Sequence, residues 1–329
     1  MKTILVTGIG ALIGQGIIQA LNNLPDRQNI KLVGIDRNVD THARFLCDHF
    51  IQKPRLNELS AEYIDFWTRL LSEEGIDLIL PGIEDDVIFF NEHRQSPLGN
   101  FPALLNSRKT LSIGLDKYAL FVFSTENNIP AIPSALASDS IALDNLNLLQ
   151  KKTILKPRAS NGSRGMFRFE RIEELQSFLK NKSFDELNDL IVQPYIGSDS
   201  EEYTASVFGF GDGAYQGPIV FKRLLAKEGY TKYAKTVYPP NDIVTCIDIV
   251  AKYCTPVGPT NFQFRKHDNQ FLLMEINPRF SSTTSLKAAF GFDEARMSFH
   301  FFFNGAKDFN LSLVEGEAWR YTSDFIKYL

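Results

Sequence analysis

Short apolar runs alternate with segments of helical period over the first 112 residues. The runs at 3–7, 31–36 and 76–82 are apolar almost throughout, and amphipathic segments at 12–24 and 61–75 separate them. Strands that are apolar on both faces are typical of parallel sheets with helices on both sides. The pattern therefore predicts a doubly wound, Rossmann-like parallel sheet in residues 1–112.

The pattern changes in the second third of the chain. Residues 112–134 predict one helix ended by Pro130 and Pro133. Beyond residue 150 the sequence favours hairpins. The expected strands and helices there are strands at 152–157, 166–169 and 190–196, a helix at 171–182, a hairpin at 202–224, a helix at 241–253 and a hairpin at 260–278. We expect three units, at 1–112, 113–190 and 191–329, in an α/β chain that ends in an α+β region.

The amino-acid composition argues against several classes of protein. The 329 residues are 44% hydrophobic and 22% charged, with a net charge of −4, which argues against a general nucleic-acid binder. No apolar run is long enough to cross a bilayer, so no membrane partner is expected. Cys47, Cys246 and Cys254 are too few for a disulfide framework, so we expect a cytoplasmic protein.

The first strand runs into a glycine-rich turn, Gly8, Gly10, Gly14 and Gly16, and the second strand ends in Asp36. One interpretation is a dinucleotide site, with the turn at the pyrophosphate and Asp36 at the ribose. The other is that the helix N-terminus after Gly10 binds an anion such as a substrate carboxylate.

Two acidic residues, Glu84 and Asp85, follow the third strand, at the sheet edge where ligands bind in open α/β folds. They are candidates for a substrate amine. Acidic residues are also favoured at helix N-termini by the macrodipole alone, so both explanations stay open.

The hairpins of the second half carry the strongest chemistry. Lys156 ends a strand and precedes a loop of small polar residues, a combination that suits phosphate. Glu275 and Asn277 share a strand face that Gln263 can join from the neighbouring strand, and such oxygen ligands suit Mg²⁺. Arg279 could reach a phosphoryl group or a carboxylate.

A strand that breaks at Pro194 frees backbone groups for an adenine edge, and Glu202 could accept hydrogen bonds from ribose hydroxyls. The order "DK … ILKP…NGSRG … VQPYIG…EEYT … NFQF … MEINPRFS" resembles an ATP-grasp enzyme. The likeness is greatest to the large chain of carbamoyl phosphate synthetase and its single-unit relatives. It covers nearly the whole chain, and residues 1–112 then resemble a pre-ATP-grasp domain, which forms one wall of the substrate pocket.

The resemblance implies a set of roles. Lys117 and Lys156 would contact ATP phosphates, and Gln263, Glu275 and Asn277 would hold Mg²⁺, or Mn²⁺ in its place. The loop that would close over the phosphates comprises Ser160, Asn161, Gly162, Ser163, Arg164 and Gly165. The adenine hinge would be Gln193, Tyr195 and Ile196, with Glu202 at the ribose. Arg279 would steady the transferred phosphoryl group, and Lys222 and Arg223 are further phosphate or substrate candidates.

The implied reaction is ligation of a small-molecule carboxylate to an amine or ammonia through an acyl phosphate. Carbamoyl phosphate synthesis is the nearest alternative, but Ser282 stands where those enzymes carry a second arginine, and the chain holds one ATP-grasp unit. An NAD(P)-dependent oxidoreductase and a nucleotide sensor without turnover are the other classes. The phenylalanine-rich segment 299–305 predicts core or a subunit contact, so a homodimer is considered.

We predict that Mg-ATP protects the loop at 158–165 from proteolysis, because a reactive acyl phosphate requires a lid over it. Limited trypsin digestion with and without Mg-ATP, followed by mass spectrometry of the fragments, measures cleavage after Arg158 and Arg164. Cleavage at these sites that does not change with Mg-ATP would contradict a closing loop.

Overall fold

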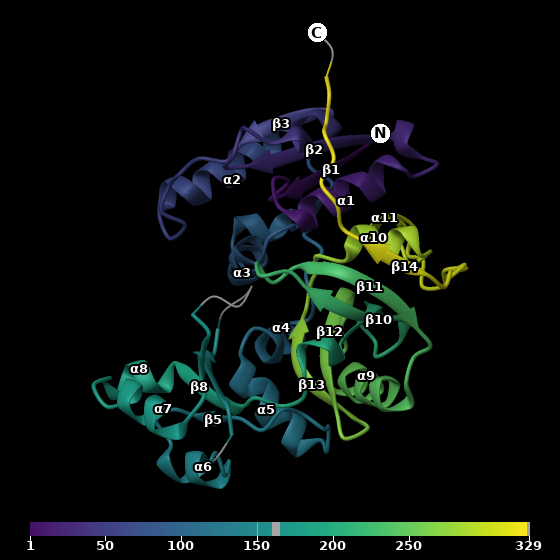
Figure 1. Ribbon diagram of the computed structural model, residues 1–329. Helices are drawn as coiled ribbons and strands as arrows, with labels where there is room; N and C mark the ends of the chain where they lie inside the picture. The colour runs from purple at the N-terminus through teal and green to yellow at the C-terminus, as the bar shows by residue number, and fades with distance from the viewer. Residues whose placement is uncertain (150, 160–164, 328–329) are drawn as a thin grey trace.

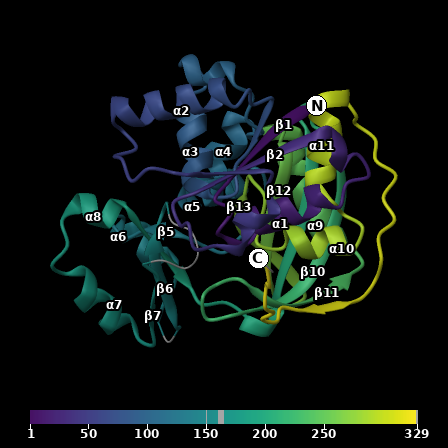
Figure 2. The same cartoon turned by 90° about the horizontal axis from the view of Figure 1, so that it is seen from above.

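The computed structural model describes residues 1–149, 151–159 and 165–327, and it contains three sheets (Figures 1 and 2). The first is parallel, with strand order β3-β2-β1-β4. Its strands are β1 (Lys2–Thr7), β2 (Ile30–Asp36), β3 (His49–Gln52) and β4 (Leu78–Leu80). The helices of this part are α1 (Leu12–Asn22), α2 (Ala61–Glu73) and α3 (Glu84–Glu92). The predicted parallel sheet is confirmed, and β3 is an edge strand that the hydrophobic pattern did not reveal.

Both faces of the parallel sheet are buried. One face packs with α2 and α3 around Trp67, which is fully buried. The other packs with α1 and with Phe280 and Phe299 from the far end of the chain. That face is completed by α10 (Thr284–Ala289) and α11 (Glu294–Asn304), which contact α1. In the phenylalanine-rich segment Phe299 is buried in this core, Phe301 and Phe303 are partly buried against hydrophobic clusters, and Phe302 is 37% exposed.

The second sheet is antiparallel, with order β5-β8-β6-β7. Its strands are β5 (Ala135–Leu136), β6 (Thr153–Pro157), β7 (Phe167–Phe169) and β8 (Leu190–Pro194). Its helices are α6 (Ser140–Asn145), α7 (Ile172–Leu179) and α8 (Phe184–Asn188). They enclose a small core of their own around Leu155 and Leu175.

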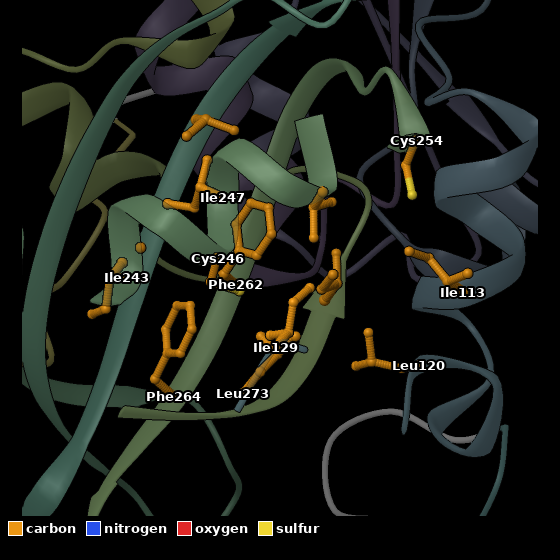
Figure 3. Close-up of a cluster of buried hydrophobic side chains, with 14 of the residues drawn as sticks. Ile113, Leu120, Ile129, Ile243, Cys246, Ile247, Cys254, Phe262, Phe264 and Leu273 are labelled. Carbon is orange, nitrogen blue, oxygen red and sulfur yellow. The ribbon is translucent and has the colours of Figure 1, made fainter. Parts of the chain in front are cut away.

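The third sheet is six-stranded and antiparallel, with order β13-β12-β9-β10-β11-β14. Its strands are β9 (Glu202–Phe210), β10 (Tyr215–Leu225), β11 (Thr231–Val237), β12 (Val257–His267), β13 (Gln270–Asn277) and β14 (Glu317–Trp319). Helix α9 (Asn241–Cys254) packs on one face, where Ile243, Ile247, Phe262 and Phe264 meet (Figure 3).

The segment expected as one helix at 112–134 is two helices, so that prediction is wrong. They are α4 (Arg108–Gly114) and α5 (Lys117–Glu126). Asp116 starts the second, because its side chain accepts hydrogen bonds from the amides of Tyr118 and Ala119. The boundary expected at residue 112 falls inside α4. Among the described residues, no helix combines the length and apolarity that a bilayer crossing requires.

The N-terminus of α3 is held by a buried ion pair. Lys53, just after β3, pairs with Asp86 in the first turn of α3, and both side chains are at most 3% exposed. The Lys53 ammonium also lies near the rings of Tyr63 and Trp67. The pair fixes the helix turn that carries Glu84 and Asp85.

We predict that Lys53→Met lowers the free energy of unfolding by about 3–5 kcal/mol, because it leaves the Asp86 carboxylate buried without its counter-charge. Urea denaturation measures the loss, and Lys53→Met/Asp86→Leu recovers most of it. Lys152→Met, which breaks the exposed pair with Glu170, is the matched control. If Lys53→Met and Lys152→Met lowered the free energy of unfolding equally, the buried pair would contribute no more to stability than the exposed one.

Candidate active site

The register of the hairpin β12–β13 brings the three expected metal ligands together. Gln263 lies directly opposite Glu275, and Asn277, two residues beyond Glu275, shares its face. The intervening residues Phe262 and Ile276 point into the core against α9. One strand face is thus apolar and buried while the other presents a carboxylate and two amides, a donor set that suits Mg²⁺.

Lys117 and Lys156 come from different elements but reach the same cavity. Lys117 is the first residue of α5, and its Nζ lies 3.8 Å from Oε1 of Glu275. Lys156 lies near the end of β6. Arg158 joins the two elements, because its guanidinium pairs with Asp116 at 2.5 Å and its carbonyl oxygen accepts from the Lys117 amide.

The lysines line a cavity of about 480 Å³ between the second and third sheets. Its other lining residues are Met166, Arg168, Asp199, Glu202, Leu224, Leu225, Ala226, Lys227, Gly229, Gln263, Arg265, Met274 and Glu275. Burial lowers the pKa of the Lys156 ammonium to about 8, and repulsion from Lys117 and Arg265 adds to the lowering, while Glu275 opposes it. The cavity is of a size for a nucleotide and carries several cationic groups.

Glu202 lies in this cavity, but its carboxylate is held by two arginines. Arg223 contacts Oε1 at 2.7 Å, and Arg265 contacts Oε2 at 3.1 Å. All three side chains are at most 8% exposed. The sequence reasoning missed Arg265, although it lies two residues after Gln263 and therefore on the same strand face.

The Lys222 side chain does not reach either of the two cavities beside Glu275. Adjacent residues on a strand face opposite sides, so Arg223 points to the cavity side while Lys222 points away. The Lys222 ammonium pairs with Glu201 at 2.5 Å. Neither of the two cavities beside Glu275 is lined by Lys222.

The expected adenine hinge lies at the end of β8 and just beyond it. The Gln193 side chain donates to Ser134 at 2.7 Å, and the Tyr195 amide donates to the carbonyl of Lys152 at 2.8 Å. The Gln193 side chain and the Tyr195 amide are therefore engaged beside the second sheet, and none of the three expected hinge residues lines the cavity of about 480 Å³. Ser160, Asn161, Gly162 and Ser163 lie outside the described residues; Gly165, just after them, has a φ of +69°.

A second cavity, of about 580 Å³, adjoins the first at Gln263, Glu275, Leu225 and Gly229. Its remaining lining residues are Ala11, Leu12, Ile13, Gly82, Ile83, Glu84, Asp85, Arg223, Glu228, Tyr230, Asn261, Asn277, Arg279, Ser281 and Ser282. It lies between the parallel sheet and the hairpin β12–β13. The strand face that carries the candidate metal ligands therefore borders both polar cavities.

Arg279 and Glu84 meet across this second cavity. Two guanidinium nitrogens contact Oε2 of Glu84 at 2.9 and 2.7 Å, and Nη2 also donates to Oδ1 of Asn277 at 3.0 Å. Both charged side chains are 12% exposed. The pair connects α3 of the parallel sheet to the end of β13, while the neighbouring Asp85 is exposed.

Gly10 lies outside both of these cavities. Its amide donates to Oδ2 of Asp36 at 2.7 Å, beside a separate cavity of about 300 Å³. A Cβ at Gly14 would lie 2.3 Å from the carbonyl oxygen of Gly8, so Gly14 is required for α1 to approach the turn. Asp36 thus occupies the turn to which a dinucleotide phosphate would bind, whereas Ala11, Leu12 and Ile13 reach the second cavity.

Comparison with known proteins identifies the fold. A scan against protein-family models and a search of curated proteins both find no match. Among solved structures, the chain is similar to a biotin carboxylase–β-γ-ATP complex from Campylobacter jejuni, with TM-score 0.74 and 16% identity over 96% of this chain and 74% of that one. It is also similar to N5-carboxyaminoimidazole synthetase from Staphylococcus aureus complexed with ADP, with TM-score 0.71 and 14% identity over 95% and 80%.

A third similar structure is the biotin carboxylase domain of Hydrogenobacter thermophilus 2-oxoglutarate carboxylase, in complex with MgADP, ADP and bicarbonate. It has TM-score 0.71 and 15% identity over 92% of this chain and 70% of that one. The resemblance expected from the motifs is confirmed at the level of fold: the chain has a pre-ATP-grasp parallel sheet followed by an ATP-grasp fold.

We predict that Mg-ADP binds less tightly as the pH rises above about 8, because Lys156 then loses the charge that attracts a phosphate. Below that pH the ammonium is already present; above it, binding has to draw a proton from solution. Calorimetric titration at pH 7 and pH 9, in two buffers of different ionisation enthalpy, measures affinity and proton uptake together. Lys156→Met should bind weakly without pH dependence, and equal affinity at both pH values in the unaltered protein would contradict the assignment.

Proposed function

We propose that this protein is an ATP-dependent carboxylate–amine ligase. The observation that supports this most directly is the position of Gln263 and Glu275, which line both cavities. A nucleotide in the lysine-lined cavity would have its terminal phosphate directed at the second cavity, where the acid and the amine would bind. Such an arrangement suits transfer between two bound molecules without a covalent enzyme intermediate.

In the proposed reaction a carboxylate oxygen attacks the γ-phosphorus, the bond to the β-phosphate oxygen breaks, and ADP leaves. The amine then attacks the acyl carbon, the C–N bond forms, phosphate leaves and the amine loses a proton. Mg²⁺, or Mn²⁺, would neutralise phosphate charge when bound at Gln263, Glu275 and Asn277. Oδ1 of Asn277 can serve both this site and Arg279, since a carbonyl oxygen has two lone pairs.

The protein's own residues position the reactants. Lys117 and Lys156 would contact the phosphates, with Ser160, Asn161, Gly162, Ser163 and Gly165 closing over them. Gln193, Tyr195 and Ile196 would flank the adenine. Glu202 is fixed by Arg223 and Arg265 and would accept from the ribose at its remaining lone pairs.

Arg279 would stabilise the transferred phosphoryl group, and its pairing with Glu84 holds the guanidinium in place beside the metal ligands. Asp85 and Glu84 would lie near the amine. Ser282 lines the second cavity, so the position does not supply the extra positive charge that a small anion such as bicarbonate would need. This supports a larger carboxylic acid as the substrate, and a small-molecule amine or ammonia as the second one.

We predict that Glu275→Ala abolishes ADP release without unfolding the protein, because the carboxylate is 25% exposed and belongs to the site rather than the core. A coupled assay of ADP release, run with Mg-ATP and a panel of carboxylic acids and amines, measures turnover. The thermal unfolding midpoint with Mg-ATP, NAD⁺ or NADP⁺ is measured in parallel.

Each result has a distinct meaning. An acid- and amine-dependent ADP release that Glu275→Ala removes supports the ligase. A rise of the midpoint with Mg-ATP but no ADP release with any pair would instead indicate a nucleotide sensor. A rise with NAD⁺ or NADP⁺ alone would indicate an oxidoreductase that uses the N-terminal turn, and would refute the proposal.

A further inference from the structure

Asn261 is a buried amide of the second cavity with an unused donor. It lies on β12, directly opposite Asn277 and on the same strand face as Gln263, and it is 1% exposed. Its Oδ1 accepts hydrogen bonds from the hydroxyls of Thr204 and Ser206, both at 2.8 Å. Its Nδ2 has no acceptor among the residues that the structure describes. A buried amide donor without an acceptor is costly, so a ligand is expected there.

A buried lysine contacts one of the two hydroxyls that hold this amide. Lys287 of α10 is 0% exposed and donates to Ser206 at 3.0 Å, to Ser281 at 3.1 Å and to Glu294 at 2.6 Å. An ammonium can only donate, so the Ser206 oxygen accepts there, while the Ser206 hydroxyl itself donates to Oδ1 of Asn261. Because the hydroxyls of Thr204 and Ser206, both on β9, donate to the amide oxygen of Asn261, its NH₂ group is turned away from β9.

The Lys287 ammonium uses all of its protons in hydrogen bonds. Its three protons are matched by three acceptors, and Glu294, also 0% exposed, supplies the counter-charge. Thr284 donates to the second oxygen of Glu294 at 3.0 Å. A fully satisfied buried network of this kind restricts its members, including the Ser206 hydroxyl that contacts Asn261.

We propose that the Nδ2 group of Asn261 binds the carboxylate that is phosphorylated, and that Lys287 is the positioning residue that directs it there through Ser206. This inference rests on the proposed function and assigns part of its substrate site. An NH₂ group can donate two hydrogen bonds, which suits an oxygen-rich acceptor and excludes an ammonium. The location suits the reacting end of the acid, because Asn261 adjoins Gln263 and Asn277 in the same cavity.

Acetate is the probe of binding, in the full-length protein with Mg-ADP present. In protein labelled with ¹⁵N-asparagine, the side-chain NH₂ signals of Asn261 are those missing from Asn261→Asp. We expect acetate to shift them in a saturable manner, whereas methylammonium chloride, of similar size but without an acceptor, leaves them in place. Signals that respond to neither ion, or to both alike, would overturn the proposal.

The kinetic test uses the acid that the ADP-release assay selects. Asn261→Asp replaces the donor by an acceptor of the same shape, so we expect KM for the acid to rise at least tenfold while KM for ATP changes less than twofold. Asn106→Asp is the matched control, because Asn106 is also a buried amide, 2% exposed, that bonds only to the protein and lines neither cavity. Any loss of stability should be similar in the two variants, while KM for the acid should change only in the first.

The positioning role of Lys287 needs a variant that still folds. Lys287→Met/Glu294→Gln removes both buried charges together and leaves no isolated one. We expect a similar rise of KM for the acid, loss of the acetate shift at Asn261, and no further rise when Asn261→Asp is added. Additive effects, or an acetate shift that persists without Lys287, would show that the lysine is only structural.

The two proposals fail differently. ADP release without an acetate shift and with an unchanged KM in Asn261→Asp would overturn the role of Asn261 while the ligase stands. An acetate shift at Asn261 without ADP release from any acid and amine would support the carboxylate site and overturn the ligase.

Discussion

The register of the hairpin β12–β13 determines what the rest of the molecule can do. Phe262, Phe264 and Ile276 are buried against α9, and this burial forces Gln263, Glu275 and Asn277 to the opposite face. A slip of one residue would exchange the two sets and put the carboxylate into the core. The same hydrophobic contacts that stabilise the third sheet therefore also align the candidate metal ligands.

The second constraint is the contact between the two halves of the chain. Helix α10 packs against α1 so closely that a Cβ at Gly16 would lie 3.1 Å from the amide nitrogen of Ser285. On the other side of the second cavity, Arg279 and Glu84 form a mostly buried ion pair between β13 and α3. The two halves of the chain are thus joined by a close helix packing and by one charged contact beside the second cavity. The charged contact adjoins the candidate metal ligand Asn277, where a small movement would matter most to the proposed phosphoryl transfer.

Sequence patterns predicted the parts of this structure that depend on local periodicity. The parallel sheet, the two hairpins and the shared face of Gln263, Glu275 and Asn277 all follow from alternation along strands and from turn residues. The split between α4 and α5 was missed, since the capping role of Asp116 depends on one side chain rather than on the apolar pattern. Lys222 was grouped with Arg223, although alternation places the two on opposite faces. Arg265 and Asn261 were missed because their roles arise from partners on β9, β10 and α10, which lie far away in sequence.

The N-terminal glycines illustrate why such a motif does not identify a ligand by itself. Gly14 is needed because α1 approaches the preceding turn more closely than any side chain permits, and this holds for every tight strand–turn–helix unit of this geometry. What differs between functions is the group that the turn binds. Here the Asp36 carboxylate receives the Gly10 amide and the Asn38 amide, so the protein itself supplies the anion. The turn then serves to place Ala11, Leu12 and Ile13 against the second cavity. Asp36 therefore determines which group the turn binds, because its carboxylate already accepts the Gly10 amide. Close packing of α1 on the turn is sufficient to explain Gly14.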